Sequence, residues 1–135
     1  MKKVLTVGVF DLMHFGHVML FKRAKEFGDE LIVAVQDSAF IGMFKPDSKI
    51  VYSTDQRLLM VHSIRYVDRV ITYTAIDQLI QDVEFDVFVK GPDQTHAGFD
   101  FAVQWCHKNN KVVIELPRTE GISSSMVRDL INDSL

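Results

Sequence analysis

The sequence predicts an α/β fold in which residues 1–135 form a single domain around a Rossmann-like, doubly wound sheet of five parallel strands. Two observations predict it. Short apolar runs alternate along the chain with segments of helical spacing, which is typical of a parallel sheet covered by helices on both faces. The chain also has no repeat, linker or low-complexity tract, and its 135 residues suffice to bury one core.

The expected strands are the short apolar runs, and the expected helices follow them in order. The first run is unbroken and β-branched, as in a strand buried on both faces. A helix near 54–64 is preceded by Ser53, which lies at capping-box spacing from Gln56. The strands are expected at 4–10, 31–35, 67–73, 85–89 and 112–116. The other helices are expected at 18–27, 76–83, 101–109 and 126–131. In such a sheet a ligand binds beyond the carboxyl ends of the strands.

Residues 8–17, which read GVFDLMHFGH, carry the strongest functional signal, because the first strand gives way to a helix there. His14 and His17 are three positions apart and therefore lie on one face of that helix. A helix N-terminus offers free N–H groups and the positive end of the helix dipole, so the pair favours a bound phosphate. Gly16 in the first turn costs about 1 kcal/mol relative to alanine. That cost indicates the close approach of a base or ribose.

The two histidines also allow two plainer interpretations, as ordinary helix residues or as half of a zinc site. The remaining histidines are scattered and Cys106 is the one cysteine, so protein side chains are not expected to hold a metal. One cysteine also excludes an intrachain disulfide. The combination of the histidines with Gly8, Asp11 and Gly16 favours a nucleotide.

A second phosphate site is expected at residues 118–125, which read RTEGISSS and follow the last apolar run. The serines suit the N-cap and first turn of a final helix. Arg118 can add a bidentate contact to the same anion. The plainer interpretation is a serine-rich cap beside a surface arginine. Two such segments at strand-to-helix junctions, at opposite ends of one chain, favour the functional interpretation.

The two segments together resemble a known family. Gly8-Val9-Phe10-Asp11-x-x-His14-x-Gly16-His17 resembles the nucleotide-binding signature of the cytidylyltransferases in the HxGH nucleotidyltransferase superfamily. Arg118-Thr119-Glu120-Gly121-Ile122-Ser123-Ser124 resembles the second signature of the same enzymes. The resemblance extends through residues 65–68 and 99–101 and is strongest for the bacterial glycerol-3-phosphate cytidylyltransferases.

The resemblance implies an enzyme that transfers CMP from CTP to a small phosphorylated alcohol, with glycerol 3-phosphate the leading candidate, and that releases pyrophosphate. The acceptor's phosphate is anionic near neutrality, because the second pKa of a phosphomonoester is about 6, so no general base is needed. The resemblance further implies Mg²⁺ on the triphosphate. It also implies a homodimer, with residues 64–70 as the expected contact.

The resemblance assigns roles to the residues at matching positions. The residues expected to act on the reacting phosphates are His14, His17, Arg118 and two loop lysines, Lys45 and Lys49. The residues expected to contact the nucleotide are Gly8, Val9, Phe10, Asp11, Gly16, Thr119, Gly121, Ile122, Ser123 and Ser124. The residues expected to contact the acceptor are Arg57, Arg65, Asp93 and Gln94. Gln94 stands where the family carries tryptophan, and Pro92 where it carries an acid, so the identity of the alcohol stays open.

Two alternatives stay open at this point. Ser123-Ser124-Ser125-x-x-Arg128 also resembles the signature of adenylyltransferases in the same superfamily, which use ATP, whereas residues 119–121 favour CTP. The second alternative is a nucleotide-binding module without turnover.

The composition argues against a nucleic-acid-binding, membrane-spanning or secreted protein. The net charge of −3 argues against nucleic-acid binding, and no apolar stretch is long enough to span a bilayer. The N-terminal Met1-Lys2-Lys3 leads directly into the first strand, so we expect a cytoplasmic protein without a signal peptide.

Overall fold

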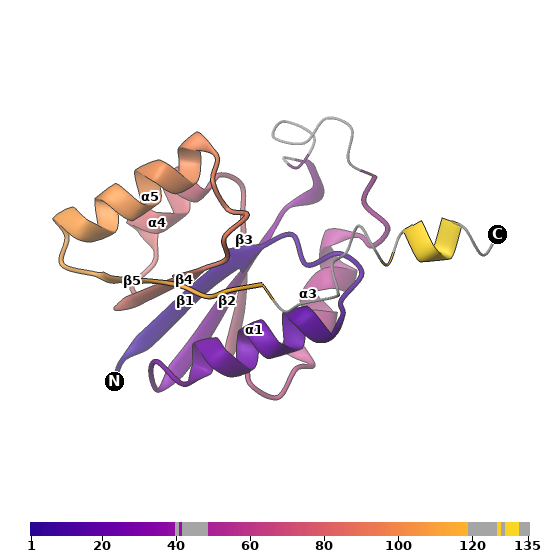
Figure 1. The fold of residues 1–135 in the computed structure, drawn as a ribbon, viewed down its shortest axis with the longest axis horizontal. Coiled ribbons are helices and arrows are strands. Elements are labelled where there is room, and N and C mark those ends of the chain that lie inside the picture. Colours follow the sequence, from indigo (N-terminus) through magenta and orange to yellow (C-terminus); the bar gives the residue numbers. More distant parts are fainter. Residues whose placement is uncertain (40, 42–48, 119–126, 128, 133–135) are drawn as a thin grey trace.

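The computed structural model describes residues 1–39, 41, 49–118, 127 and 129–132. Strands and helices alternate through this part of the chain (Figure 1). Their bounds are β1 Lys3–Gly8, α1 Phe15–Lys25, β2 Glu30–Gln36, α3 Thr54–His62, β3 Arg69–Tyr73, α4 Ile76–Asp82, β4 Val87–Lys90, α5 Ala97–Lys108 and β5 Val112–Glu115. Residue 127 and residues 129–132 are helical as well. None of the helices in the described ranges is long and apolar enough to cross a bilayer.

The five strands form one sheet in the order β3-β2-β1-β4-β5, and every neighbouring pair is parallel. The central strand β1 pairs with β2 on one side and with β4 on the other, so that Val4 lies between Leu31 and Val87. The strand order therefore reverses at β1, which is where an open parallel sheet leaves a crevice at its carboxyl edge. This topology confirms the predicted Rossmann-like, doubly wound sheet.

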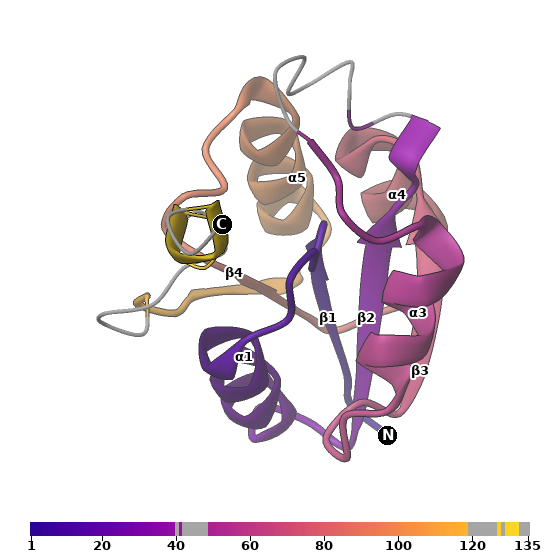
Figure 2. The same cartoon turned by 90° about the vertical axis from the view of Figure 1, so that its right-hand side faces the viewer.

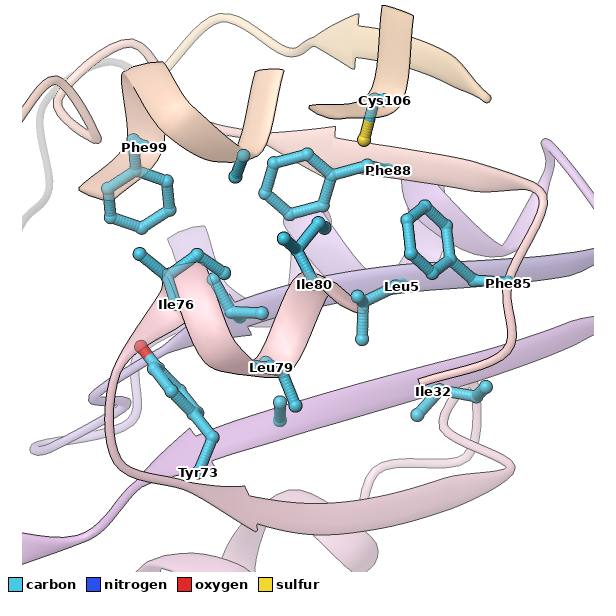
Figure 3. Close-up of a cluster of buried hydrophobic side chains, with 13 residues drawn as sticks. Leu5, Ile32, Tyr73, Ile76, Leu79, Ile80, Phe85, Phe88, Phe99 and Cys106 are labelled. Carbon is cyan, nitrogen blue, oxygen red and sulfur yellow. The ribbon is translucent and has the colours of Figure 1, made fainter. Parts of the chain in front are cut away.

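Helices cover both faces of the sheet, and the side chains of each strand alternate between the two faces. Leu5 and Val7 pack toward α4 and α5, whereas Val4 belongs to the cluster that contains residues of α1 and α3. Figures 1 and 2 show α4 and α5 on one side of the sheet and α1 on the other. Figure 3 shows Phe88 of the sheet close to Ile80 of α4. This two-sided burial explains why the strands read as continuous apolar runs.

Each element expected within the described residues is present, and the differences lie at the ends. The first strand stops at Gly8 rather than at Phe10, because Phe10 has a φ of 55° and the chain turns there. Helix α5 begins at Ala97 rather than at 101, because the His96 side chain caps it by accepting from the Gly98 N–H at 3.1 Å. The capping box expected before α3 is confirmed. The serine cap expected at 123–125 lies outside the described residues.

Candidate active site

The turn that leaves β1 leads directly into α1 (Figure 2). The two predicted histidines form the N-terminal cap of this helix. Nδ1 of His14 accepts a hydrogen bond from the Gly16 N–H at 3.0 Å. Nδ1 of His17 accepts one from the His14 N–H at 3.2 Å, so the two imidazoles complete a capping box. A nitrogen that accepts from a backbone N–H carries no proton. In its neutral form each ring therefore carries its proton on Nε2.

The two rings are stacked, with centroids 3.9 Å apart and an angle of 22° between their planes. Burial, and after it repulsion from a charged His14, together lower the pKa of His17 to about 4. Burial also lowers the pKa of His14. The free protein thus holds both rings uncharged at neutral pH, as Nε2–H donors at the positive end of the α1 dipole. That combination suits the oxygens of a phosphate.

The turn between β1 and α1 supports the histidine pair through packing. The buried Phe10 ring contacts the His17 ring edge-on, at 5.5 Å between centroids, and the Phe21 ring of α1 at 5.1 Å. A Cβ on Gly8 would lie 2.8 Å from Cζ of Phe10, so the glycine leaves room for this ring. Gly8 and Phe10 were expected to contact the nucleotide. Their described contacts are with the protein and hold His17 in place.

Asp11 and Arg57, predicted for the nucleotide and the acceptor, are both buried in the protein. Asp11 accepts from the backbone N–H groups of Val51 and Tyr52, at 2.7 and 3.0 Å. Arg57 has no exposed surface and donates to backbone and side-chain oxygens around it, including the carbonyl of Val9 at 2.9 Å. The guanidinium therefore points at protein acceptors, and the structure does not support the expected contact between Arg57 and the acceptor's phosphate.

Asp93 and Arg118 are 25 positions apart in sequence and form an ion pair between Oδ2 and Nη2. Asp93 follows β4 and Arg118 follows β5, so the pair joins the carboxyl ends of two neighbouring strands. Both side chains are more than half exposed and remain accessible to a ligand. The structure thus brings together one residue predicted to act on the reacting phosphates and one predicted for the acceptor.

Gln94 ties the loop after β4 to the end of β1. Its Nε2 donates to the carbonyl of Val7 at 2.8 Å, and its Oε1 accepts from the Gly91 N–H at 3.1 Å. The amide thus has backbone partners on both sides. Its expected contact with the acceptor stays a prediction.

Arg65 lies at the opposite edge of the sheet from the histidines. It follows α3, and nearby Asp68 exchanges two hydrogen bonds with Leu31, at the amino end of β2. The Arg65 guanidinium carbon lies 5.7 Å from the centroid of the Tyr66 ring. The described residues therefore place Arg65 away from the histidines of its own chain, and its expected contact with the acceptor stays a prediction.

Comparison with known proteins places this geometry in a family. The family model described as cytidylyltransferase-like matches residues 5–130, which include β1, the histidine cap and Arg118. The chain belongs to the cytidylyltransferase-like family. A glycerol-3-phosphate cytidylyltransferase of Bacillus subtilis is 42% identical over 134 residues, covering 97% of this chain and 98% of the relative. A glycerol-3-phosphate cytidylyltransferase of Staphylococcus aureus is 44% identical over 131 residues, covering 95% of this chain and 93% of the relative.

A solved structure shares the fold of this cytidylyltransferase-like chain. The lipopolysaccharide core biosynthesis protein of Thermoplasma volcanium superposes with a TM-score of 0.71 at 25% sequence identity. The match covers 88% of this chain and 97% of that protein.

Several residues expected in a cytidylyltransferase-like site lie outside the described residues. They are Lys45, Thr119, Gly121, Ile122, Ser123 and Ser124. Lys49 is described, is exposed, and lies two residues before Val51, whose N–H binds Asp11. Gly16 is the second residue of α1, and the carbonyl of Val9 accepts from Arg57. The assigned contacts of these residues with a nucleotide stay predictions.

Sequence analysis missed His96. It caps α5 as His14 caps α1, with Nδ1 accepting from the N–H of a glycine two positions on. The two helices follow β4 and β1, which are neighbours in the sheet. The signal was the repeated spacing His14-x-Gly16 and His96-x-Gly98, which is visible in the sequence of this cytidylyltransferase-like chain.

Proposed function

We propose that the protein transfers CMP from CTP to glycerol 3-phosphate, giving CDP-glycerol and pyrophosphate. The observation that carries this proposal is the stacked pair of His14 and His17, whose Nδ1 atoms cap α1 and whose Nε2 atoms carry the protons. Two relatives that match nearly their whole length are named glycerol-3-phosphate cytidylyltransferases, which supports CTP over ATP and this acceptor over others.

In the proposed reaction a phosphate oxygen of the acceptor attacks the α-phosphorus of CTP. The new P–O bond forms as the bond to the β-phosphate oxygen breaks, and pyrophosphate leaves with that electron pair. The nucleophile is already an anion, so no side chain has to remove a proton. The chain's contribution is to align the two phosphates and to stabilise charge on the transferred group. We assign this stabilisation to the Nε2–H groups of His14 and His17 and to the positive end of the α1 dipole.

We propose that Mg²⁺ arrives on the triphosphate as part of the substrate, where it neutralises the leaving pyrophosphate. Among the described residues there is no group of three or more histidines, cysteines or carboxylates that could hold a metal. The carboxylate of Asp11 accepts two backbone N–H groups, and that of Asp93 pairs with Arg118. The phosphate oxygens themselves are therefore the expected ligands.

The acceptor is proposed to bind beside Asp93, beyond the carboxyl end of β4, where the ion pair with Arg118 brings both charges to the crevice. We also propose that the protein forms a homodimer and works in the cytoplasm, as the resemblance to the family implies.

The test is pyrophosphate release by the purified protein with Mg²⁺, for each of CTP, ATP, GTP and UTP combined with a panel of phosphorylated alcohols. We expect the highest kcat/KM for CTP with glycerol 3-phosphate, and CDP-glycerol as the product in mass spectrometry. Release from ATP but not from CTP would contradict the cytidylyl assignment. Turnover of CTP only with a different alcohol would contradict the acceptor alone.

A further inference from the structure

We propose that Arg57 and Asp11 are positioning residues that fix the segment 49–53 against the turn between β1 and α1. The two side chains thereby fix the position of this turn relative to segment 49–53, and we place the reacting phosphates between the two. This proposal rests on the proposed function for what the site does, but its structural part can be tested without turnover.

Arg57 connects three parts of the chain through one buried guanidinium. Its Nη1 donates to the carbonyls of Val9, after β1, and Gln36, at the end of β2, at 2.9 and 2.8 Å. Its Nε donates to the carbonyl of Tyr52 at 3.2 Å. Its Nη2 donates to the Ser38 hydroxyl at 2.7 Å. A guanidinium has five donors in a fixed plane, which a lysine does not reproduce.

Asp11 holds the same segment from the other side. Its two carboxylate oxygens accept from the N–H groups of Val51 and Tyr52. The Tyr52 residue is therefore held at its N–H by Asp11 and at its carbonyl by Arg57. The two side chains carry opposite charges, and both are at least nine-tenths buried. A buried charge without its partner is costly, so neither is expected to leave this arrangement readily.

Phe10 links this arrangement to the histidine pair. Val9, which Arg57 binds, and Asp11 flank Phe10, and Phe10 has a positive φ of 55°. The Phe10 ring contacts the edge of His17. In the segment 49–53, Lys49 lies two residues before Val51, whose N–H binds Asp11. A displacement of about 1 Å at a reacting group can cost about a hundred-fold in rate, so this double anchorage matters to turnover.

The test is a double-mutant cycle on kcat/KM that combines Arg57→Lys with Lys49→Ala. We expect Lys49→Ala to lower kcat/KM by roughly ten-fold in the native background and by less than about two-fold beside Arg57→Lys, because coupled residues are not additive. The matched control combines Arg57→Lys with Asp93→Asn, for which we expect additive losses. Asp93 belongs to the other side of the crevice and shares no described contact with Arg57.

Three outcomes of the cycle overturn the proposal. If Lys49→Ala costs the same factor in both backgrounds, Arg57 does not act through this segment. If Lys49→Ala leaves kcat/KM unchanged in the native background, the segment itself is not part of the site. If Arg57→Lys raises only the KM for the acceptor, the guanidinium contacts the acceptor directly.

A second measurement covers the possibility that Arg57→Lys does not fold. Hydrogen exchange of Asp11→Asn, which keeps the size of the side chain and one acceptor oxygen, needs no substrate. We expect faster exchange in residues 49–53 and 9–13, with α4 and α5 unchanged. Unchanged exchange in both segments overturns the proposal. A native protein that fails to turn over CTP would refute the proposed function and leave this result intact.

Discussion

At the residue scale, each histidine of the pair has two separable jobs. The Nδ1 atoms satisfy backbone N–H groups at the start of α1, whereas the Nε2 atoms are left with the protons. Ser53 and Gln56 perform the same capping at α3 without any imidazole. The Ser53–Gln56 pair therefore shows that a glutamine at the third position of a helix can keep the cap without supplying an imidazole.

His17→Gln should keep the helix cap and lose the catalysis. The glutamine oxygen can accept from the His14 N–H as Gln56 does from Ser53, so the melting temperature should change little. The lost Nε2–H donor should lower kcat by roughly a hundred- to a thousand-fold, with a smaller change in the affinity for CTP. His17→Ala should show the same loss of kcat together with a lower melting temperature. Near-normal turnover in the glutamine variant would reduce His17 to a capping residue.

The same histidine should make the free energy of unfolding depend on pH. Its pKa is about 4 in the folded protein and 6.5 when unfolded, so between these values the unfolded chain binds more protons. The neutral His17 ring contributes about 3 kcal/mol to the free energy of unfolding. This contribution is fully present above about pH 6.5 and is lost as the pH falls toward 4. Urea unfolding at a series of pH values measures it. His17→Gln should show a shallower dependence, and an equal slope in both proteins would contradict this prediction.

Residue roles were harder to predict from sequence than residue positions. The spacing of His14 and His17 predicted one shared helix face, but it did not show that each Nδ1 serves the cap. Arg57 was predicted to contact the acceptor because the family resemblance assigns that role to an arginine at this position. What overrides that expectation is a set of backbone carbonyls from three separate segments, and only the folded chain brings these together.

At the element scale, the junction between β1 and α1 is built from interlocking parts. The strand ends where Phe10 and Leu12 adopt positive φ values, and the Phe10 ring folds back over Gly8. Apolar periodicity predicted the strand and the helix on either side. It overran the strand by two residues because the ending depends on the backbone conformation of Phe10, for which an apolar side chain gives no signal.

Gly8→Ala tests this junction. The added Cβ would lie 2.8 Å from Cζ of Phe10, so the ring must move away from His17. We expect a loss of about 1–3 kcal/mol in the free energy of unfolding and a lower kcat. Gly91→Ala is the control for stability, because its Cβ would meet no atom within 4 Å. Equal melting temperatures for the two variants would show that the Phe10 ring moves aside freely.

At the scale of the whole molecule, sheet order decides which distant residues meet. Alternation of strands and helices predicted a parallel sheet and therefore a site at its carboxyl edge. It did not predict that β4 and β5 would bring Asp93 to Arg118. Topology also explains the position of Arg65, because a loop that follows a helix and leads into a parallel strand lies at the amino edge of the sheet. Family resemblance predicts Arg65 as an acceptor contact, whereas the order of the elements places its loop at the edge of the sheet opposite the histidines.

The exposed position of Arg65 makes it a test of the proposed homodimer, whose expected contact is residues 64–70. Within residues 64–70, Val67 is buried and Asp68 binds the Leu31 N–H, whereas Arg65 is exposed and can face a second copy. A two-fold contact uses the same patch on both subunits, so Arg65→Glu places its changed charge in the interface twice. We expect light scattering after size exclusion to show a dimer for the native protein and a monomer for this variant at micromolar concentration. Lys22→Glu is the matched control, because it makes the same change of charge at an exposed position on α1 and should stay dimeric. A dimeric Arg65→Glu protein would place the contact elsewhere, and a monomeric native protein would refute the homodimer itself.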